Sequence, residues 1–334
     1  MLAVQYQGYG DYQENRIVDL PRPQPIDGEV LVEMHSVGIN PLDNTLRSGH
    51  FYAATPENLP RIGGQTGVGV VLESKSPDLA AGDRVFVSGK GFGVTVDGTW
   101  RQLIALPATG LKRVPVNVDD NHAAAFLAGA GYLTGYLALT EFAHFRPGQT
   151  VLAPGIGGAV GMETVQIARH LGASMAISTA STTLKAEQAR VAGYEHVIDL
   201  SREALQDGVM RLTNGKGVDV VVDGISGSLT KAALGSLAFG GMLVIAGYAG
   251  GRDAAVDVTD IIWKGAQIRG FTFKPGIFSA ETVEAAQQAC IDFLAAGALQ
   301  PTIAKVFPLT EAAEAVRYLV EDRPFGRVVM STII

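Results

Sequence analysis

The chain has 334 residues, enough for two domains, and its 47% hydrophobic and 18% charged residues are typical of a folded globular protein. A net charge of −7 without a basic run argues against nucleic-acid binding, and no apolar run approaches the length of a membrane span or resembles a signal peptide. The single cysteine, Cys290, excludes an internal disulfide, so we expect a cytoplasmic protein with no membrane or nucleic-acid partner.

The first third of the sequence is typical of short strands separated by Gly and Pro. Residues Glu29–Met34 alternate polar and apolar side chains, the period of a half-buried strand. Gly67–Leu72 is the next predicted strand, and Arg84–Val87 follows a turn at Ala81–Asp83. This spacing of short strands and turns predicts a partly open β-barrel domain.

Beyond residue 120 the pattern changes to alternating helices and strands. Asn121–Thr140 is rich in Ala and Leu and predicts a helix, with Asp119 or Asp120 as its N-cap. Strands are predicted at Thr150–Ala153, Ser174–Thr179, Val197–Ile198, Val218–Val222, Met242–Ala246 and Ile268–Phe273, and helices at Gly161–Leu171, Leu184–Ala192 and Leu229–Leu237. Such alternation predicts an α/β domain with a doubly wound parallel sheet of the Rossmann type.

The last part of the chain resembles the first third more than the middle. Helices are predicted at Glu281–Ala296 and Thr310–Glu321, and strands at Ala304–Phe307 and Arg327–Ser331. We therefore expect one domain from residues 1–123 and 273–334, with the α/β domain, residues 124–272, inserted between its two parts.

A glycine-rich turn joins a predicted strand to a predicted helix within residues 151–161. Its glycines recur every third residue, and such a turn lets the backbone approach a pyrophosphate at the positive end of the helix. The alternative is a tight turn without a ligand, but the position inside a βα series favours a dinucleotide. The predicted cofactor contacts here are Gly155, Gly158, Ala159, Val160 and Gly161.

The end of the second strand of the alternating series bears on the choice between NAD and NADP. An acidic residue there would bind the ribose of NAD, whereas this sequence has hydroxyl residues and a lysine over residues 178–185. Hydroxyl donors and a cation suit a 2′-phosphate, so we predict NADPH, contacted by Ser178, Ser181 and Lys185. The alternative for Lys185 is a solvated helix residue.

Ligands for a catalytic metal are not evident in the sequence. None of the six histidines lies at ligand spacing from another, and Cys290 is expected to be a small buried side chain in a helix. The sequence also has no Gly-x-Ser-x-Gly elbow and no phosphate-binding loop of the NTPase type. We therefore expect no metal site.

These features together resemble the medium-chain dehydrogenase/reductase superfamily, and within it the zinc-free quinone oxidoreductases, or zeta-crystallin group. The most specific segment besides the glycine turn is Gly38-Ile39-Asn40-Pro41-Leu42-Asp43, followed by Arg47-Ser48-Gly49. Where zinc-dependent relatives carry Gly-His-Glu, this chain has Gly64-Gln65-Thr66. Pro154, and Thr45 in place of a frequent tyrosine, depart from the family pattern.

The resemblance implies a GroES-like substrate domain in residues 1–123 and 273–334, and an inserted NADP-binding Rossmann domain in residues 124–272. It also implies further site residues and a quaternary state. It implies that Thr134 faces the cofactor, that Arg323 reaches the 2′-phosphate, and that Asn40 and Tyr52 act on the substrate, with Asn40 also near the cofactor. Residues implied around the nicotinamide are Ala246, Gly247, Tyr248, Phe271, Thr272 and Phe273. Relatives of this group commonly form homodimers through the edge strand that Ile268–Phe273 would provide.

The implied reaction is hydride transfer from NADPH to a quinone or an α,β-unsaturated carbonyl. Asn40 and Tyr52 are the candidate donors to the developing oxyanion, although Asn40 could be only a turn residue and Tyr52 only an aromatic wall. An enoyl-thioester reductase is an alternative, which would need basic groups for an acyl carrier. An NADPH-binding protein with a structural or RNA-binding role is an alternative of another class, against which the acidic balance counts.

Overall fold

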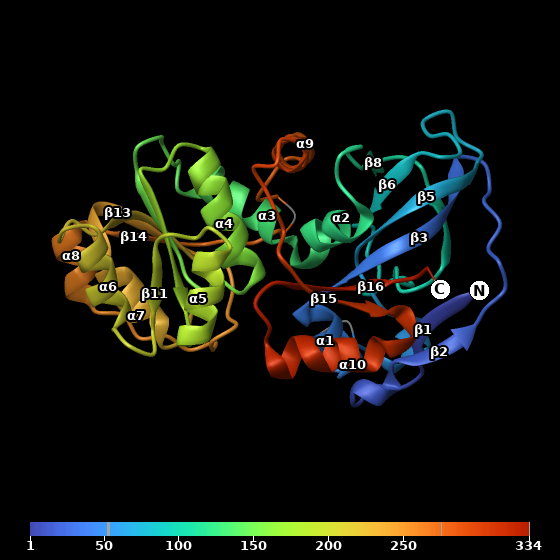
Figure 1. Cartoon of the computed structure of the whole chain (residues 1–334), viewed down its shortest axis with the longest axis horizontal. Helices are drawn as coiled ribbons and strands as arrows, with labels where there is room; N and C mark the ends of the chain where they lie inside the picture. Colours follow the sequence, from blue (N-terminus) through green and yellow to red (C-terminus); the bar gives the residue numbers. More distant parts are fainter. Residues whose placement is uncertain (52–53, 275, 334) are drawn as a thin grey trace. The chain divides into compact units, whose positions relative to one another are not determined.

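The computed structural model describes residues 1–51, 54–274 and 276–333, which divide into two compact units (Figure 1). The first unit comprises Met1–Gly129 and Pro301–Ile334, and the second comprises Ala130–Gln300. The second stretch of the first unit therefore begins 28 residues later than residue 273, the start expected from sequence. The reason is helix α9 (Ala280–Ala295), whose Cys290 packs in the second unit with its Sγ 3.8 Å from the carbonyl oxygen of Tyr132.

The first unit is built on a mainly antiparallel sheet. Its strand order is β15-β16-β3-β5-β6-β8, with β7 also paired to β3, and β2-β1-β4 form a separate small sheet. The strands are β1 (Leu2–Tyr6), β2 (Arg16–Asp19), β3 (Glu29–Ile39), β4 (Arg61–Ile62), β5 (Gly67–Ser74), β6 (Arg84–Val87), β7 (Leu103–Pro107), β8 (Lys112–Arg113), β15 (Ile303–Pro308) and β16 (Arg327–Ser331). This GroES-like arrangement agrees with the predicted partly open barrel, and the strands Arg84–Val87 and Arg327–Ser331 are confirmed to the residue.

Short helices complete the first unit: α1 (Pro41–Arg47), α2 (Asp120–Leu127) and α10 (Ala312–Arg317). The predicted cap of the second of these is confirmed, since the Asp119 carboxylate accepts a hydrogen bond from the His122 N–H at 3.0 Å. The core joins valines of β3 to Trp100 and Phe307. The strand β3 itself is buried on both faces near its start, with Leu31 inaccessible as well as its neighbours Val30 and Val32, rather than half-buried as its polar–apolar alternation predicts.

A half-buried histidine network connects β3 to the start of α2. His35 Nδ1 lies 2.8 Å from Asp120 Oδ2, and Arg84 Nε donates to Asp120 Oδ1 at 3.1 Å. The hydrogen bond with Asp120 raises the pKa of His35 above its ordinary value, against the opposing effect of burial. The protonated, ion-paired imidazole is therefore a stabilising element of the folded state.

This network predicts a pH-dependent contribution to stability. Because the folded-state pKa of His35 is raised, its contribution is full below the unfolded-state pKa of about 6.5 and is lost as the pH rises through the folded-state pKa. We expect His35→Gln to lower the free energy of unfolding most near pH 6 and progressively less toward pH 8, measured by urea titration. In an Asp120→Asn background the same substitution should give a flat difference, and a wild-type difference independent of pH would contradict the assignment.

The second unit is a doubly wound parallel sheet with strand order β11-β10-β9-β12-β13-β14, as the sequence predicts. The strands are β9 (Thr150–Ala153), β10 (Met175–Ala180), β11 (Val197–Asp199), β12 (Val218–Asp223), β13 (Leu237–Ile245) and β14 (Gln267–Gly270). The helices are α3 (Gly131–Leu137), α4 (Ala159–His170), α5 (Thr183–Val191), α6 (Leu205–Leu212), α7 (Leu229–Gly235), α8 (Val258–Lys264) and α9 (Figure 1). The order in which the chain adds strands reverses between β9 and β12, and this switch point is where such folds bind nucleotides.

The predicted helix Asn121–Thr140 is not continuous. Gly129 and Ala130 both have positive φ, 84° and 49°, so α2 ends before them and α3 begins after them. By length and hydropathy, Asp120–Phe142 is the one helical run in the described residues that could span a membrane, but 78% of its most apolar window is buried inside the protein. Its apolar character is explained by core packing.

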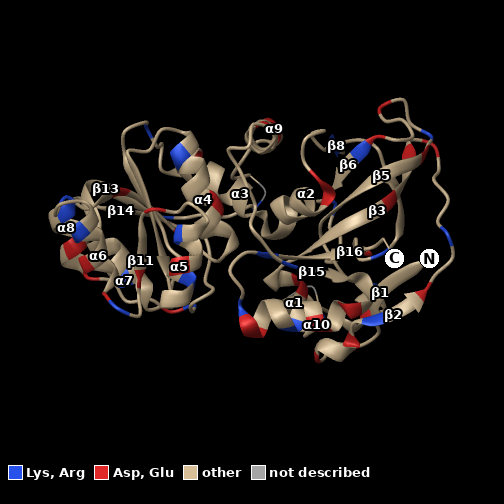
Figure 2. Ribbon diagram, viewed as in Figure 1, with Lys and Arg blue, Asp and Glu red and all other residues tan. Residues whose placement is uncertain are grey.

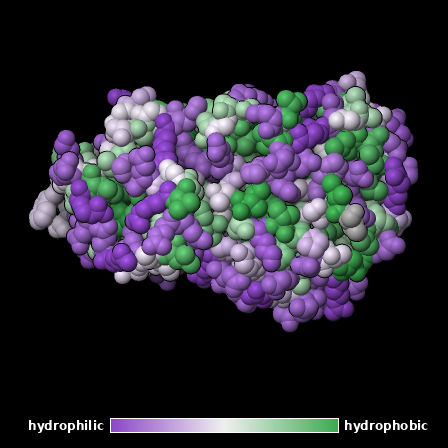
Figure 3. Space-filling model, in the orientation of Figure 1, coloured by the Kyte–Doolittle hydropathy of each residue, from purple (hydrophilic) through white to green (hydrophobic). Residues whose placement is uncertain are grey.

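Charged residues of both signs are interspersed along both units (Figure 2). On the face drawn in Figure 3, polar residues separate several smaller hydrophobic groups.

Candidate functional site

The turn between β9 and α4 has the geometry of a phosphate-binding turn. Gly155 has a φ of 86°, which an L side chain rarely adopts. Gly158 is the N-cap of α4 and offers no side chain to the helix, and the first turn carries no acidic residue. The first N–H groups of this 12-residue helix are therefore left without a competing side-chain acceptor, at its positive end.

The third glycine of the turn is required by close packing. A Cβ built on Gly161 would lie 2.4 Å from the carbonyl oxygen of Gly155 and 2.6 Å from that of Pro154. A side chain at this position would push α4 away from the turn, so the spacing of the glycines is a steric requirement of the fold as well as a ligand signature.

The turn after β12 meets the glycine turn at the switch point. A Cβ on Gly155 would lie 2.7 Å from Ile225 Cδ1, and one on Gly224 would lie 2.9 Å from Val160 Cβ. The buried carboxylate of Asp223 shapes this second turn by accepting the Ile225 N–H at 2.9 Å. The Asp223 carboxylate is therefore a structural group of this turn.

The end of β10 differs in detail from the prediction. Ser178 is 1% exposed and its hydroxyl donates to the Ala153 carbonyl oxygen at 2.5 Å, so that hydroxyl is already engaged within the sheet. Thr179, which the sequence reasoning did not single out, accepts the Gly155 N–H on its Oγ1 at 3.0 Å. The residue that supports the glycine turn from β10 is therefore Thr179.

Beyond β10 the chain is exposed again at Ser181, and Thr182 caps α5 by accepting the Lys185 N–H at 3.3 Å. Lys185 is half-buried in the first turn of this helix. An acidic residue, Asp199, ends the neighbouring strand β11, where hydrogen bonds from the Ser201 and Thr183 hydroxyls hold its pKa below the usual range. Its charge is thus engaged by local donors.

The predicted cofactor residues that follow β13 and β14 lie at the carboxyl end of the strands, as the glycine turn does, because β9, β13 and β14 run parallel. Ala246 donates its N–H to the Asp223 carbonyl oxygen at 2.7 Å, and the Gly247 carbonyl oxygen accepts the Ser226 hydroxyl at 2.7 Å. Further residues of this edge are Tyr248, Phe271, Thr272 and Phe273, of which Tyr248 and Phe273 are exposed. Thr134 is buried in α3.

In the first unit, three polar side chains gather at the start of α1. Asn40 is the N-cap: its Oδ1 accepts the Leu42 N–H, and its own N–H donates to Asp43 Oδ2, both at 2.8 Å. The Gln65 amide nitrogen donates to Asp43 Oδ1 at 3.0 Å and to Asn40 Oδ1 at 3.3 Å. Burial raises the pKa of Asp43 to about 7, against the lowering effect of these donors.

Two predicted residues are not joined to these groups by any described contact. Tyr52 lies outside the described residues. Arg323 belongs to the first unit, ends a helical turn with a φ of 47°, and is exposed, whereas Lys185 belongs to the second unit.

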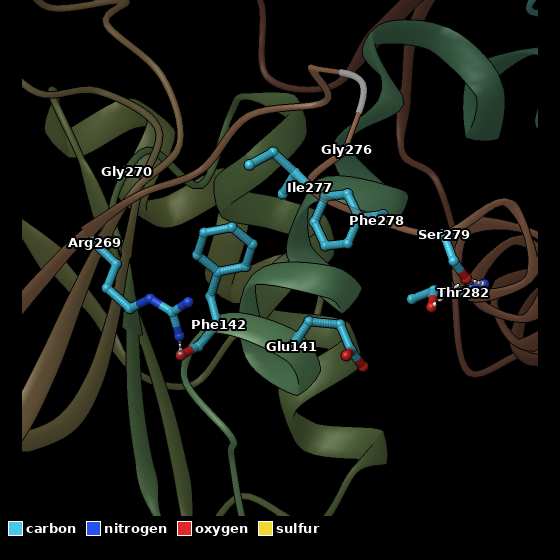
Figure 4. A pocket seen from close by; sticks show the side chains of 9 residues that line it. All are labelled: Glu141, Phe142, Arg269, Gly270, Gly276, Ile277, Phe278, Ser279 and Thr282. Atoms are coloured by element: carbon cyan, nitrogen blue, oxygen red, sulfur yellow. Dashed lines mark hydrogen bonds between the residues drawn. The ribbon is translucent and has the colours of Figure 1, made fainter.

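A cavity of about 480 Å³ opens in the second unit beside β14 (Figure 4). Arg269 Nη1 donates to the Phe142 carbonyl oxygen at 2.8 Å, and its guanidinium carbon lies 4.7 Å from the centre of that ring. Phe278 packs on Phe142 with ring centres 5.7 Å apart. This cavity contains none of the predicted site residues.

No group of three or more His, Cys, Asp or Glu side chains capable of holding a metal gathers in residues 1–51, 54–274 and 276–333. Cys290 is fully buried, as expected for a packing residue, and burial raises the pKa of its thiol.

Comparison with protein families gives two matches. Residues 26–116 match the model described as "Alcohol dehydrogenase GroES-like domain", and residues 159–289 match that described as "Zinc-binding dehydrogenase". The first match lies in the first unit and the second lies in the second unit.

Similar proteins cover nearly the whole chain. A 2-haloacrylate reductase of Burkholderia sp is 31% identical, over 92% of this chain and 91% of its own length. Quinone oxidoreductase-like protein 2 of Rattus norvegicus is 29% identical, over 92% of this chain and 87% of its own length. A solved NAD-dependent alcohol dehydrogenase superposes with a TM-score of 0.86 at 28% identity, covering 99% and 100%. A mycobacterial protein solved in complex with NADPH superposes with a TM-score of 0.81 at 29% sequence identity, and the match covers 99% of each chain.

Proposed function

Because the chain belongs to the zinc-free quinone oxidoreductase group of the medium-chain dehydrogenase/reductase superfamily, we propose that it reduces small electron-poor acceptors, quinones or α,β-unsaturated carbonyl compounds, with NADPH. The observation on which the proposal rests is a glycine turn at the switch point of a doubly wound sheet, with no side chain capping the helix that follows. The chain that contains this turn is similar to a 2-haloacrylate reductase and to a quinone oxidoreductase-like protein. We further propose a cytosolic location, with no membrane or nucleic-acid partner.

The residues of the second unit fit a dinucleotide. When bound, NADPH supplies the hydride. The turn of Gly155, Gly158 and Gly161 would hold the pyrophosphate, since α4 presents its first N–H groups with no side chain or acid competing for them. The loops after β13 and β14, at Ala246–Tyr248 and Phe271–Phe273, would border the nicotinamide end, with Thr134 as a further contact.

Preference for NADPH over NADH is supported by the end of β10. No carboxylate follows the strand directly, Asp199 is engaged by its own hydroxyl donors, and Lys185 lies in the first turn of α5. The similarity to an NAD-dependent enzyme makes this preference worth testing directly. Ser181, Lys185 and Arg323 are the proposed contacts of the 2′-phosphate. The Ser178 hydroxyl donates to the Ala153 carbonyl oxygen within the sheet, so Ser178 would hold the end of β10 in place beside the cofactor.

We expect Lys185→Ala to weaken NADPH binding about tenfold, the loss of a charge-assisted hydrogen bond worth roughly 1.4 kcal/mol. NADH binding should not change, because NADH lacks the 2′-phosphate. Titration of cofactor fluorescence measures both dissociation constants, and Lys216→Ala, which removes an exposed lysine after α6, is the matched control. Equal affinity of the wild-type protein for NADH and NADPH would refute the preference.

The reaction itself is tested with a panel of acceptors. The protein is mixed with NADPH and 1,4-benzoquinone, 9,10-phenanthrenequinone, an alkenal or a crotonyl thioester, and the absorbance at the reduced nicotinamide band is followed. Turnover with a quinone or the alkenal supports the proposal. Turnover with the thioester alone would indicate an enoyl-thioester reductase, and oxidation with none of the four acceptors would overturn the reductase function.

We also propose that two copies of the chain pair through the edge strand β14. All four of its residues are exposed, and α8, which precedes it in the chain and packs on β13, presents Ile262 and Trp263, exposed by 70% and 77%. An unpaired strand edge next to exposed apolar side chains is a pairing surface, and twofold pairing would close it.

A charge on this edge is expected to prevent pairing. Ile268→Lys should convert a dimer at micromolar concentration into a monomer, because pairing would then bury an unpaired ammonium group. Light scattering coupled to gel filtration measures the mass. Val191→Lys, an exposed apolar residue at the end of α5, is the control that should remain dimeric. A monomeric wild-type protein would contradict the proposal.

A further inference from the structure

The hydrogen bonds at the start of α1 leave one polar group of Asn40 for an outside acceptor. We propose that Gln65 and Asp43 are positioning residues, a role that rests on the proposed function. They fix the Asn40 amide so that its NH₂ group donates to the carbonyl or quinone oxygen of the acceptor molecule.

The orientation of the Asn40 amide is determined by a backbone group. The Leu42 N–H can only donate, and it lies 2.8 Å from the Asn40 side chain, so the atom facing it must be the amide oxygen. The nitrogen Nδ2 then lies at the other end of the same planar amide group, pointing away from the Leu42 N–H. Within the described residues nothing accepts a hydrogen bond from it, although Asn40 is only 6% exposed.

The orientation of Gln65 follows from that of Asn40. Its amide approaches Asn40 Oδ1 at 3.3 Å and Asp43 Oδ1 at 3.0 Å. Because the Asn40 oxygen can only accept, the Gln65 atom between them must be the nitrogen, whichever protonation state Asp43 has. One NH₂ group thus joins the two side chains.

Asp43 holds the other end of this arrangement. Its two oxygens accept from the Asn40 backbone N–H at 2.8 Å and from Gln65, and it is 4% exposed with no cation paired to it among the described residues. A buried carboxylate without a counter-ion lowers the stability of the folded state, so its presence at this position needs a reason. The reason we infer is that it fixes both the backbone and the side-chain partner of Asn40.

A fixed amide donor suits the chemistry of the acceptor. As hydride adds to the electron-poor carbon of the acceptor, the electron pair of the π bond moves to the carbonyl oxygen, which becomes an enolate or hydroquinone oxyanion. The cofactor is thereby oxidised by two electrons, and a proton from water completes the reduced product. An N–H held in place before the reaction stabilises that oxygen without reorganising during it.

The test is a double-substitution cycle on Asn40 and Gln65. Gln65→Met removes both amide hydrogen bonds at nearly constant volume, and we expect kcat to fall between about tenfold and about a hundredfold through misplacement of Asn40. In an Asn40→Ser background the same substitution should cause no further loss, because Gln65 acts through Asn40. Losses that multiply in the double variant would overturn the proposal.

A matched control separates positioning from general destabilisation. Gln102 lies in the same unit, and its side chain accepts the Leu2 N–H at 2.7 Å and donates to Thr332. Gln102→Met should lower the melting temperature while leaving kcat unchanged. If Gln102→Met and Gln65→Met lowered kcat equally, the effect would be structural and the proposal would be wrong.

A second readout does not depend on turnover. In protein labelled with ¹⁵N at asparagine side chains, the Asn40 NH₂ resonances should shift and broaden on Gln65→Met and on Asp43→Asn, but not on Gln102→Met. Unchanged Asn40 resonances would overturn the positioning role. If the resonances change but wild-type protein reduces no acceptor, the proposed reaction fails while the positioning of Asn40 stands.

Discussion

Replacing Asn40 with serine is expected to lower kcat about 100-fold or more while leaving the fold intact. Serine is as good an N-cap as asparagine, so the hydrogen bond from the Leu42 N–H that starts α1 can be kept. What is lost is the Nδ2 donor, and removal of one preorganised oxyanion donor costs about 10²–10³ in rate. Steady-state kinetics with NADPH and the best acceptor of the panel measure the effect.

The matched control is Asp119→Ser, which makes the same kind of change at the N-cap of α2 in the same unit. It should leave kcat within about twofold of wild type. A rise in the NADPH dissociation constant of Asn40→Ser without a fall in kcat would assign Asn40 to cofactor binding alone. Unchanged kinetics would reduce Asn40 to a capping residue.

Gly161→Ala is expected to cause the second large effect, a loss of NADPH affinity of about tenfold or more. The added Cβ would lie 2.4 Å from the Gly155 carbonyl oxygen, closer than any real contact, so α4 or the turn must move. Overpacking of this kind costs roughly 1–3 kcal/mol, and here the displaced atoms are those proposed to hold the pyrophosphate. Fluorescence titration measures the affinity, and thermal unfolding measures the accompanying loss of stability.

Gly158→Ala separates the steric cause from a general intolerance of the turn. Its Cβ would lie 3.4 Å from the same Gly155 oxygen, an ordinary contact, and Gly158 has φ of −100°. It should therefore lose much less affinity than Gly161→Ala. Equal losses from both substitutions would indicate that the spacing, not the contact at Gly161, determines binding.

The parts of the fold that could be predicted from sequence are those with one dominant physical signal. The alternation of apolar strands with helices around Thr150–Ala153 predicts the parallel sheet, and that strand is confirmed to the residue. Helix α8 has no such signal, because none of its residues is buried, and it is absent from the prediction. Helix α6 does show apolar residues at helical spacing, Leu205, Val209 and Leu212, which would have revealed it.

Two boundaries were wrong for reasons that lie outside local sequence. The predicted strand Ile268–Phe273 ends at Gly270, since after the Phe271 N–H bonds to Ile245 the chain leaves the ladder. The predicted helix ending at Leu237 stops at Gly235, because Leu237 already begins β13. Side-chain periodicity does not specify which of two neighbouring elements a terminal residue joins.

Residues of the candidate site that belong to a sequence motif could be predicted. Residues whose role depends on contacts between distant positions could not. The glycine spacing indicates the turn, and Gly-Ile-Asn-Pro-Leu-Asp indicates Asn40. Gln65 could be noted only as a substitute for a metal-binding residue, since its contact with Asp43 joins positions 22 residues apart. The buried state of Ser178 likewise depends on the register of β10 against β9.

The capping box at the start of α1 has a consequence for how the protein loses activity. The hydrogen bonds that begin this seven-residue helix are the same bonds that orient Asn40, so the helix start and the donor cannot be disordered separately. Short helices at the surface of a domain open at lower free energy than the core strands. Partial opening of residues 40–48 would therefore abolish activity while the sheets of both units remain folded. Loss of activity would then precede global unfolding in denaturant.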